Sequence, residues 1–292
     1  DDIIIDFNKI FLNSGIFFNI KSDTKLNIRL IHDTSDNFTI FQSNFINFKK
    51  KCEVQLEDHF NLTNNTINNI NYNINVEEGA AIKHNIFQNF TNSNKLYLTS
   101  NTVCEKNSSY SQNTYNFSDG FVRNFHNVNL NGEFSNASLK GCFFLKDKNI
   151  CSNKTNIIHN AENCVSDQTY KGILNDHSKA SYYSNTFVSE NAQKTEGYQL
   201  SKGILLTDNC SFFSKPELRI FADEVKCSHG STIGPVDESA LYYLRSRGIS
   251  KNEAMKMIIS SFIEEDLQNL DKNIAERVSK NLSDYLANLV ND

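Results

Sequence analysis

The chain has 292 residues and a formal net charge of −5, with 39% hydrophobic and 22% charged residues. These values suit a folded protein with a sizeable buried core. The acidic balance weighs against a general nucleic-acid surface, which needs clustered Lys and Arg. The sequence holds no long unbroken apolar run, so we expect no membrane span. Residues 1–6 are acidic where a secretory signal would be basic.

Residues 1 to about 225 are rich in Ile, Phe, Tyr, Val, Thr and Asn and poor in Ala and Leu. β-Branched and aromatic residues at a period of two fit the half-buried surface of a sheet. The chain is therefore expected to begin directly in strands. Asn is interleaved with Ile, Phe and Leu, which favours a folded structure over disorder. The runs expected to form strands are 16–20, 26–31, 38–41, 54–56, 67–74, 96–98, 143–145 and 182–188.

The strand patterns recur along the second part of this region. Ile173, Phe187, Leu205 and Ile220 follow one another at intervals of 14, 18 and 15 residues. Such recurrence is typical of the stacked coils of a solenoid. Asn would suit the coil corners because it tolerates a left-handed backbone. A β-sandwich, with strands spaced about every 8–12 residues, remains open on periodicity alone.

From Asp237 onward the pattern becomes helical. Asp237 is expected to cap a first helix that carries Ala240, Leu241 and Leu244 on one face and ends at Gly248. The tetrapeptide 250–253 has the Ser-x-x-Glu form of a capping box and opens a second helix. The apolar face of the second helix is expected to comprise Ala254, Met257, Ile258 and Phe262.

A third helical pattern follows, with apolar residues at steps of three and four. We expect most of this stripe to pack on the β domain of the same chain. The alternative is that part of the helical region docks a partner. The members of the stripe are Leu267, Leu270, Ile274, Val278, Leu282, Leu286 and Leu289.

The seven cysteines indicate a reducing compartment. They form no C-x-x-C pair and no zinc-finger spacing, and a disulfide framework is not expected in a chain of this length. We therefore expect most of them to be small buried hydrophobic residues. Their positions are 52, 104, 142, 151, 164, 210 and 227.

The strongest local feature is Cys227-Ser228-His229, followed by Gly230. Residues two apart on an extended segment face the same side, so a thiolate and an imidazole placed in this way can bind Fe, Zn or Cu together. Two ligands do not close a metal site, and other groups or another chain must complete it. The alternative is a buried Cys beside a hydrogen-bonded His.

Signatures of self-sufficient enzymes are missing from the sequence. It contains no P-loop, no G-x-S-x-G elbow, no H-E-x-x-H and no G-x-G-x-x-G. Carboxylates are sparse in the expected strands and form no ladder of the kind that a β-helix lyase or hydrolase needs.

Several blocks of the sequence match the pattern of one known family. Three of them precede the Cys227-x-His229 segment: residues 168–172 (QTYKG), 191–199 (NAQKTEGYQ) and 205–208 (LLTD). Residues 214–234, which include SKPELRIFADEVKCSHG, and residues 241–249 match it as well. Together they resemble the SufB/SufD family of the SUF iron–sulfur cluster assembly system, and within it the SufD branch. The SufB branch lacks the Cys-x-His pair and carries a Cys where this chain has residues 201–203. The resemblance is firm from about residue 155 to 265.

This resemblance implies a mainly β fold, a right-handed parallel β-helix over residues 1–235, with a C-terminal α-helical region over 236–292. It implies a non-catalytic scaffold subunit, not an enzyme, within a SufB–SufC–SufD complex. The β-helix would pair with a SufB-like subunit, and the helical region would dock a SufC-like ATPase. Cys227 and His229 would be metal ligands at the SufB interface. The residues expected to contact the ATPase are Leu241, Leu244, Met257, Ile258 and Phe262.

No tightly bound cofactor is expected in the isolated chain, only iron or a transient iron–sulfur cluster at the interface with SufB. The isolated chain could form a homodimer, and the expected compartment is the bacterial cytoplasm or, alternatively, the plastid stroma. Two features depart from the family: a helical region usually precedes the β-helix, and Pro235 stands where a polar residue is more common. The alternatives are a SufB-like homodimeric scaffold using Cys210 or Cys164, and a carbohydrate-active β-helix enzyme.

Overall fold

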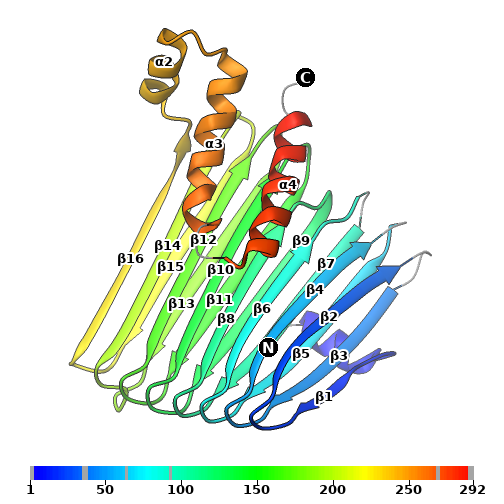
Figure 1. The fold of residues 1–292 in the computed structure, drawn as a ribbon, viewed down its shortest axis with the longest axis vertical. Coiled ribbons are helices and arrows are strands. Elements are labelled where there is room, and N and C mark those ends of the chain that lie inside the picture. The colour runs from blue at the N-terminus through cyan, green and yellow to red at the C-terminus, as the bar shows by residue number, and fades with distance from the viewer. Residues whose placement is uncertain (1–2, 35–38, 63–64, 92–93, 268–269, 289–292) are drawn as a thin grey trace.

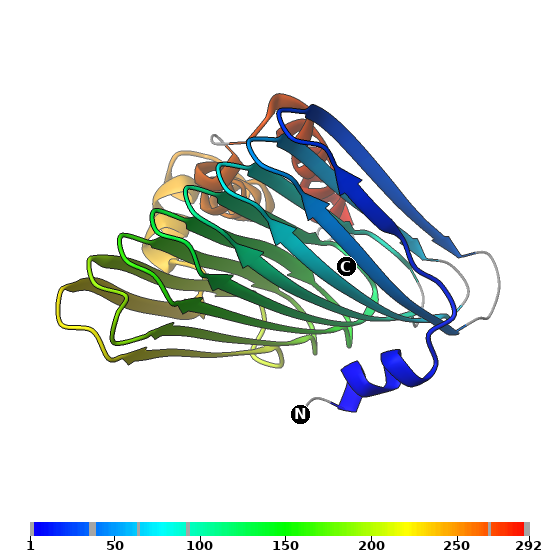
Figure 2. The same cartoon turned by 90° about the horizontal axis from the view of Figure 1, so that it is seen from below.

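The computed structural model is a parallel β-solenoid with its C-terminal helices packed against one face (Figure 1). It describes residues 3–34, 39–62, 65–91, 94–267 and 270–288. Successive strands alternate between two eight-stranded sheets, so each coil gives one strand to each sheet. Figure 2 shows the coils from below as a stack of similar layers.

All neighbouring strands within the two sheets pair in parallel. The odd-numbered sheet consists of β1 Phe17–Ile20, β3 Thr39–Phe48, β5 Ile67–Val76, β7 Asn94–Cys104, β9 Gly120–Leu130, β11 Ile150–His159, β13 Lys179–Val188 and β15 Ser211–Ile220. The even-numbered sheet consists of β2 Lys25–Thr34, β4 Glu53–Leu62, β6 Ala81–Gln88, β8 Ser109–Asn116, β10 Asn136–Leu145, β12 Val165–Leu174, β14 Thr195–Leu205 and β16 Val225–Pro235.

This topology confirms the solenoid and excludes the β-sandwich, whose strands would pair in antiparallel fashion. Equivalent positions in successive coils lie 28 residues apart at Lys49 and Glu77, and 30 residues apart at Glu196 and Lys226. The interval of about 15 residues in the sequence is therefore half a coil, one strand and its turn. Each expected strand run falls within a strand, except that Ile16 directly precedes β1 and Phe38 lies outside the described residues.

The expectation that the chain begins in strands is wrong, because residues Ile3–Ile10 form helix α1. The Nδ2 atom of Asn8 donates to the backbone oxygens of Asn69 and Gln42, at 2.6 and 3.1 Å. Asn8 is buried against the outer face of the odd-numbered sheet. These tertiary contacts outweigh the strand propensity of three consecutive isoleucines, since propensity is only a weak prior.

The expectation that Asn occupies the coil corners is only partly correct. The turns before seven of the eight even-numbered strands, β2 to β14, each carry a left-handed residue, and Asn fills only two of these positions. They are Asp23, Lys51, Gly79, Asn107, Phe134, Asn163 and Lys194. Many other asparagines line up on the outer face of the odd-numbered sheet, where Asn127 donates to Asn101 at 2.9 Å and Asn185 donates to Asn156.

The space between the two sheets is filled by inward-facing side chains from every coil. Most are apolar, including Phe48, Phe60 and Leu56, which are fully buried. A buried polar group lies among them: the Asp58 carboxylate contacts Nε2 of His84 at 2.6 Å and Nε2 of His32 at 3.0 Å. The interior is therefore not uniformly apolar, and its polar groups are mutually hydrogen-bonded at this point.

The three C-terminal helices are α2 Glu238–Ser246, α3 Lys251–Leu267 and α4 Lys272–Asn288. The predicted caps are confirmed. The Asp237 side chain accepts from the backbone N–H groups of Ser239 and Ala240. Ser250 and Glu253 bond reciprocally, as a capping box requires.

The predicted apolar face of α3 is only partly correct. Ala254 is buried, but the other fully buried apolar residues are Ile259 and Ile263. The Met257 side chain is instead 50% exposed. Which apolar residues of α3 are buried depends on how far the helix is rotated about its axis. Because α3 carries apolar residues on more than one face, the sequence alone did not determine this rotation.

The third stripe does not belong to one continuous helix, since α3 ends at Leu267 and α4 begins at Lys272. Own-chain packing is nevertheless confirmed for its main part. The buried α4 residues Ile274, Val278, Leu282 and Leu286 form one cluster with outward-facing residues of the even-numbered sheet, Phe87, Tyr115, Cys142, Phe144 and Ile173. Leu289 lies outside the described residues. Figure 1 shows α3 and α4 lying over this sheet.

Candidate functional site

The solenoid ends at β15 and β16, the last strands of the two sheets. Within the described ranges, each of them pairs with a strand on one side only. An edge strand presents unpaired backbone N–H and C=O groups that can pair with another chain. The apolar side chains of Phe213 and Phe221, 54% and 62% exposed, lie at this end.

Cys227 and His229 both lie on β16, on the side that faces the interior of the solenoid. Their register partners on β14 are Gly197 and Gln199, which are both buried. In earlier coils such inward-facing residues are covered by the next coil. After β16 no further coil follows among the described residues, so the two side chains lie at an open end.

The Cys227 side chain is half-buried and packs against a small apolar cluster of Val188, Ala192 and Ala222. Burial raises the pKa of its thiol, although a backbone hydrogen bond from Gly197 acts in the opposite direction. The thiol is therefore protonated at neutral pH, and metal binding must displace its proton. The other six cysteines are all buried, as the sequence predicted for most of them.

His229 is exposed, two residues further along the same face. Thiolate sulfur and imidazole nitrogen suit iron and zinc, so the donor set fits a metal or a nascent iron–sulfur cluster. Within the part of the chain that the structure describes, no group of three or more His, Cys, Asp or Glu side chains is arranged to hold a metal ion. The pair can supply at most part of a coordination shell, and the open end leaves room for ligands from another chain.

The residues expected to contact an ATPase lie on α2 and α3, but they do not form one exposed surface. Leu241 and Leu244 are half-buried on α2, and Ile258 is half-buried on α3. Phe262 packs against the cluster beneath α3 and α4, and the Nζ atom of Lys171 donates to its backbone oxygen at 2.9 Å. Met257 is the member of this set that is well exposed.

The most exposed aromatic side chains of the helical region were not predicted. Tyr242 and Tyr243 on α2 are 76% and 57% exposed, beside Arg247, whose guanidinium lies 5.3 Å from the Tyr243 ring centroid. Both tyrosines lie in the block 241–249 that matched the family pattern, and this match could have identified them as candidate functional residues.

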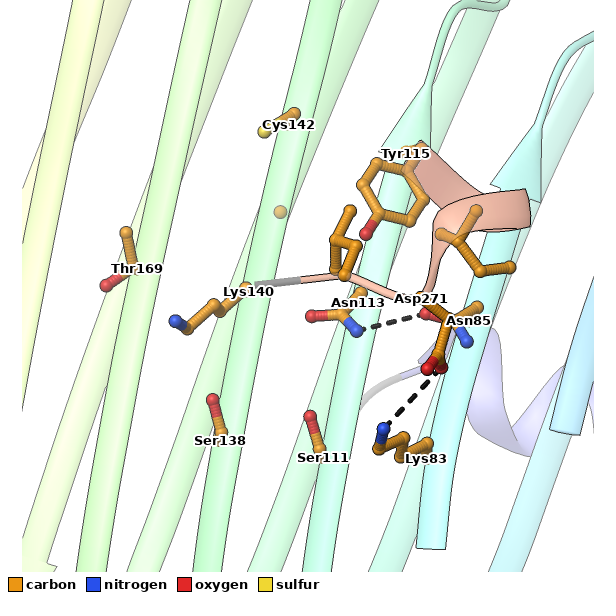
Figure 3. Close-up of a pocket in the computed structure, with 13 residues that line it drawn as sticks. Lys83, Asn85, Ser111, Asn113, Tyr115, Ser138, Lys140, Cys142, Thr169 and Asp271 are labelled. Atoms are coloured by element: carbon orange, nitrogen blue, oxygen red, sulfur yellow. Dashed lines mark hydrogen bonds and ion pairs between the residues drawn. The ribbon is translucent and has the colours of Figure 1, made fainter. Parts of the chain in front are cut away.

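A separate hollow of about 120 Å³ lies where α4 meets the even-numbered sheet. Figure 3 shows Lys83 paired with Asp271, at 3.5 Å, and Asn113 donating to Asn85, at 3.0 Å. Asp271 supplies the single carboxylate among the residues that line this hollow. The volume is below the 300–1,000 Å³ or so that is usual for small-molecule sites, and paired catalytic carboxylates are not found there.

The fold and the site define a class of protein: a β-solenoid whose last coil presents a thiol and an imidazole at an open, unpaired end. Residues 30–262 match the family model described as SUF system FeS cluster assembly, SufBD core domain. The chain therefore belongs to the SufBD family, and proteins named SufD are among its relatives.

Among these relatives is the iron–sulfur cluster assembly protein SufD of Escherichia coli, 35% identical over 144 residues, which cover 49% of this chain and 34% of that protein. A SufBD family protein of Synechocystis is 26% identical over 204 residues, covering 70% of this chain and 45% of the relative. The chloroplastic protein ABCI7 of Arabidopsis thaliana is 40% identical over 84 residues, 29% of this chain and 18% of its own length. The chain spans less than half the length of these relatives. None of the described helices is long and apolar enough to cross a membrane.

Proposed function

We propose that the chain is a non-catalytic scaffold subunit of a SufB–SufC–SufD-type complex that assembles iron–sulfur clusters. Its open end pairs with a SufB-like β-solenoid, and α2 with the outer part of α3 docks a SufC-like ATPase. Iron, sulfide and the nascent cluster are the cargo of the complex. This chain contributes Cys227 and His229 to the coordination of that cargo at the subunit interface.

One observation supports this proposal above the others: a single strand carries the candidate ligands and leads directly to the candidate docking helices. β16 holds Cys227 and His229 and ends at Pro235, and α2 begins at Glu238. When a bound ATPase displaces α2, the movement is therefore passed directly to β16, the strand that carries both candidate ligands. Pro235 restricts the backbone at this junction because its φ angle is fixed.

The unpaired edges of β15 and β16 support a β-solenoid as the partner at this end. A partner that adds strands to both edges satisfies the free backbone groups and covers Phe213 and Phe221. Covering the end also removes water from Cys227 and His229. Metal ligation then requires loss of the thiol proton and a neutral imidazole.

The exposed surface of α2 and α3 supports the docking of a second partner. Tyr242, Tyr243 and Met257 are large and exposed, and Arg247 lies over the Tyr243 ring. Tyr, Met and Arg are enriched in protein interfaces. We accordingly revise the docking set: Met257 stays, Tyr242 and Tyr243 join it, and Phe262 supports α3 from beneath.

The test is coexpression of the chain with SufB-like and SufC-like subunits of the same source. We expect the three proteins to copurify, and His229→Ala to lower the iron and sulfide content of the complex while leaving its assembly intact. His177→Ala is the matched control, because His177 is exposed in the turn that follows β12 and is not on β16. Failure to copurify, or equal iron and sulfide content in His229→Ala and the wild type, would contradict the proposal.

The SufB-like alternative, a homodimer that holds the cluster by itself, finds less support. Cys164 and Cys210, its candidate sulfur acceptors, are buried beside turns. The Cys164 Sγ contacts Ser135 Oγ at 3.4 Å, and the Cys210 Sγ contacts the Thr207 backbone oxygen at 3.1 Å. Pairing of two copies through the open end remains an outcome of the same experiment. By analogy with the bacterial and chloroplastic relatives, we place the protein in the cytoplasm or the plastid stroma.

A further inference from the structure

We infer that Gln199 is a positioning residue for His229: its side-chain oxygen accepts a hydrogen bond from the imidazole and so fixes which ring nitrogen faces the open end. This inference deepens the proposed function, because it concerns the same candidate ligand. His229 and Gln199 are register partners on the inward faces of β16 and β14. Adjacent parallel strands place such residues about 4.8 Å apart, within reach of a histidine side chain.

The orientation of the Gln199 amide is fixed by its donors. Its Nε2 atom donates to Thr186 Oγ1 at 2.8 Å and to the backbone oxygen of Glu217 at 3.2 Å. A backbone oxygen can only accept, so the nitrogen and not the oxygen of the amide must face Glu217. The other terminal atom of the Gln199 amide is consequently the oxygen, Oε1, which can only accept a hydrogen bond.

This Oε1 atom is buried and has no hydrogen-bond partner in the structure. The Gln199 residue as a whole is only 3% exposed. An unsatisfied buried acceptor is unfavourable because it has lost its hydrogen bonds to water, so a donor that can reach it by a side-chain rotation is stabilised there. His229 is exposed at the open end and is free to change its rotamer.

The preceding coil shows the same arrangement in a completed form. Gln168 is the register partner of Gln199 on β12, and its Nε2 also donates to Thr186 Oγ1, at 2.8 Å. The Gln168 Oε1, however, accepts from Thr155 Oγ1 at 2.5 Å. The row of inward-facing residues thus runs Gln168, Gln199, His229, and only the member next to the histidine lacks a donor.

Histidines that bind metals usually donate their second ring N–H to a carbonyl or carboxylate, which fixes the tautomer and the ring orientation. Gln199 Oε1 supplies that acceptor from within the chain. The remaining nitrogen, with its lone pair, then points toward the partner and the cargo. Gln199 does not touch the cargo and acts only through His229.

The experiment measures the ring nitrogens of His229 by NMR in the isolated chain labelled with ¹⁵N-histidine. We expect one tautomer in the wild type, with a slowly exchanging N–H. Gln199→Met should give the averaged nitrogen shifts of an unconstrained imidazole. Gln168→Met is the matched control, since it removes another inward-facing glutamine of the same row, one that is not a register partner of His229. Its His229 signals should equal those of the wild type.

Two results would overturn the inference: unchanged His229 signals in Gln199→Met, or equal changes in Gln168→Met. Should Gln199→Met not fold, a rapidly exchanging mixture of tautomers in the wild type would overturn it equally. A second arm titrates ferrous iron into the copurified complex, where Gln199→Met should weaken binding about 10- to 100-fold. If the NMR signals change as expected but iron binding is insensitive even to His229→Ala, the contact stands and the proposed function fails.

Discussion

The Sγ atom of Cys227 lies directly against Gly197, its register partner on β14, and leaves little room for a side chain there. A Cβ atom at position 197 would come within 3.3 Å of Cys227 Sγ and of Thr186 Cγ2. The glycine thus allows the thiol to occupy its half-buried position at the open end. The residue lies in the block 191–199 that matched the family pattern.

Gly197→Ala should therefore displace the Cys227 thiol toward solvent and destabilise the fold by about 1–3 kcal/mol, as overpacking usually does. The measurement is the rate of alkylation of Cys227 in the native protein, which should rise. Gly234→Ala is the control on β16, because a Cβ at that position meets no atom within 4 Å. An alkylation rate in Gly197→Ala equal to that of the Gly234→Ala control would contradict this account of the glycine.

Acidification should destabilise the protein through two buried histidines. Burial lowers the pKa of His126 to about 3 and that of His159 to about 4. Between these values and the ordinary pKa of about 6.5, the unfolded chain binds more protons than the folded one. The contribution of these two histidines to the free energy of unfolding is thus fully present above about pH 6.5 and is lost as the pH falls toward about 4 for His159 and about 3 for His126.

At pH 5 each of the two histidines should cost on the order of 2 kcal/mol, from about 1.4 kcal/mol per pKa unit. Urea denaturation at pH 7.5 and pH 5 measures this loss. The double variant His126→Gln, His159→Gln should show a smaller difference between the two pH values, and the exposed His177→Gln should not. If the double variant loses as much stability between pH 7.5 and pH 5 as the wild type, groups other than His126 and His159 cause the loss.

Asp58 anchors the polar group within the solenoid. Burial by itself raises the pKa of Asp58, but hydrogen bonds from His32 and His84 hold this pKa well below its usual value. The Tyr72 hydroxyl also donates to the carboxylate, at 2.8 Å. Asp58→Asn should lower the free energy of unfolding by on the order of 3–5 kcal/mol, because it leaves buried partners uncompensated.

Chemical denaturation at neutral pH measures that loss. Asp33→Asn serves as its control, since Asp33 is an exposed carboxylate on β2. Equal midpoints for the two variants would show that the buried carboxylate contributes little.

Lys171 should hold α3 on the sheet. It is buried on the outer face of β12, donates to the backbone oxygen of Phe262, and lies 5.3 Å from the Phe262 ring centroid. Lys171→Met should speed hydrogen exchange in the second half of α3 while leaving the solenoid strands protected. Lys140→Met is the control, because Lys140 is a less buried lysine paired with Asp167. Unchanged exchange in α3 would contradict an anchoring role.

The sequence was sufficient for the positions of the strands and helix starts, but the choice of a solenoid over a β-sandwich came from the family resemblance and not from periodicity. Alternating β-branched residues located the strands, and the Cys227-x-His229 spacing placed both residues on one face because strand geometry leaves no alternative. The Asp237 cap and the Ser250–Glu253 box marked helix starts by local hydrogen bonds alone. Each of these features depends on neighbours in the sequence.

The remaining features depend on contacts between distant residues. A period of two shows that Asp58 and its alternate neighbours share a face, but not that this face is the interior. Helix α1 depends on Asn8 meeting Asn69, 61 residues away. The rotation of α3, which buries Ile259 and exposes Met257, is set by the sheet beneath it. The role inferred for Gln199 required the register of β14 and β16.

The central claim is that the open end of the solenoid presents Cys227 and His229 to a partner subunit. Cys227 is the one cysteine of the seven that is not fully buried, so native alkylation followed by peptide mass spectrometry reports on this end directly. We predict that Cys227 reacts in the isolated chain and becomes protected when a SufB-like subunit is bound. Equal reactivity of Cys227 in the free chain and in the purified complex would contradict the account.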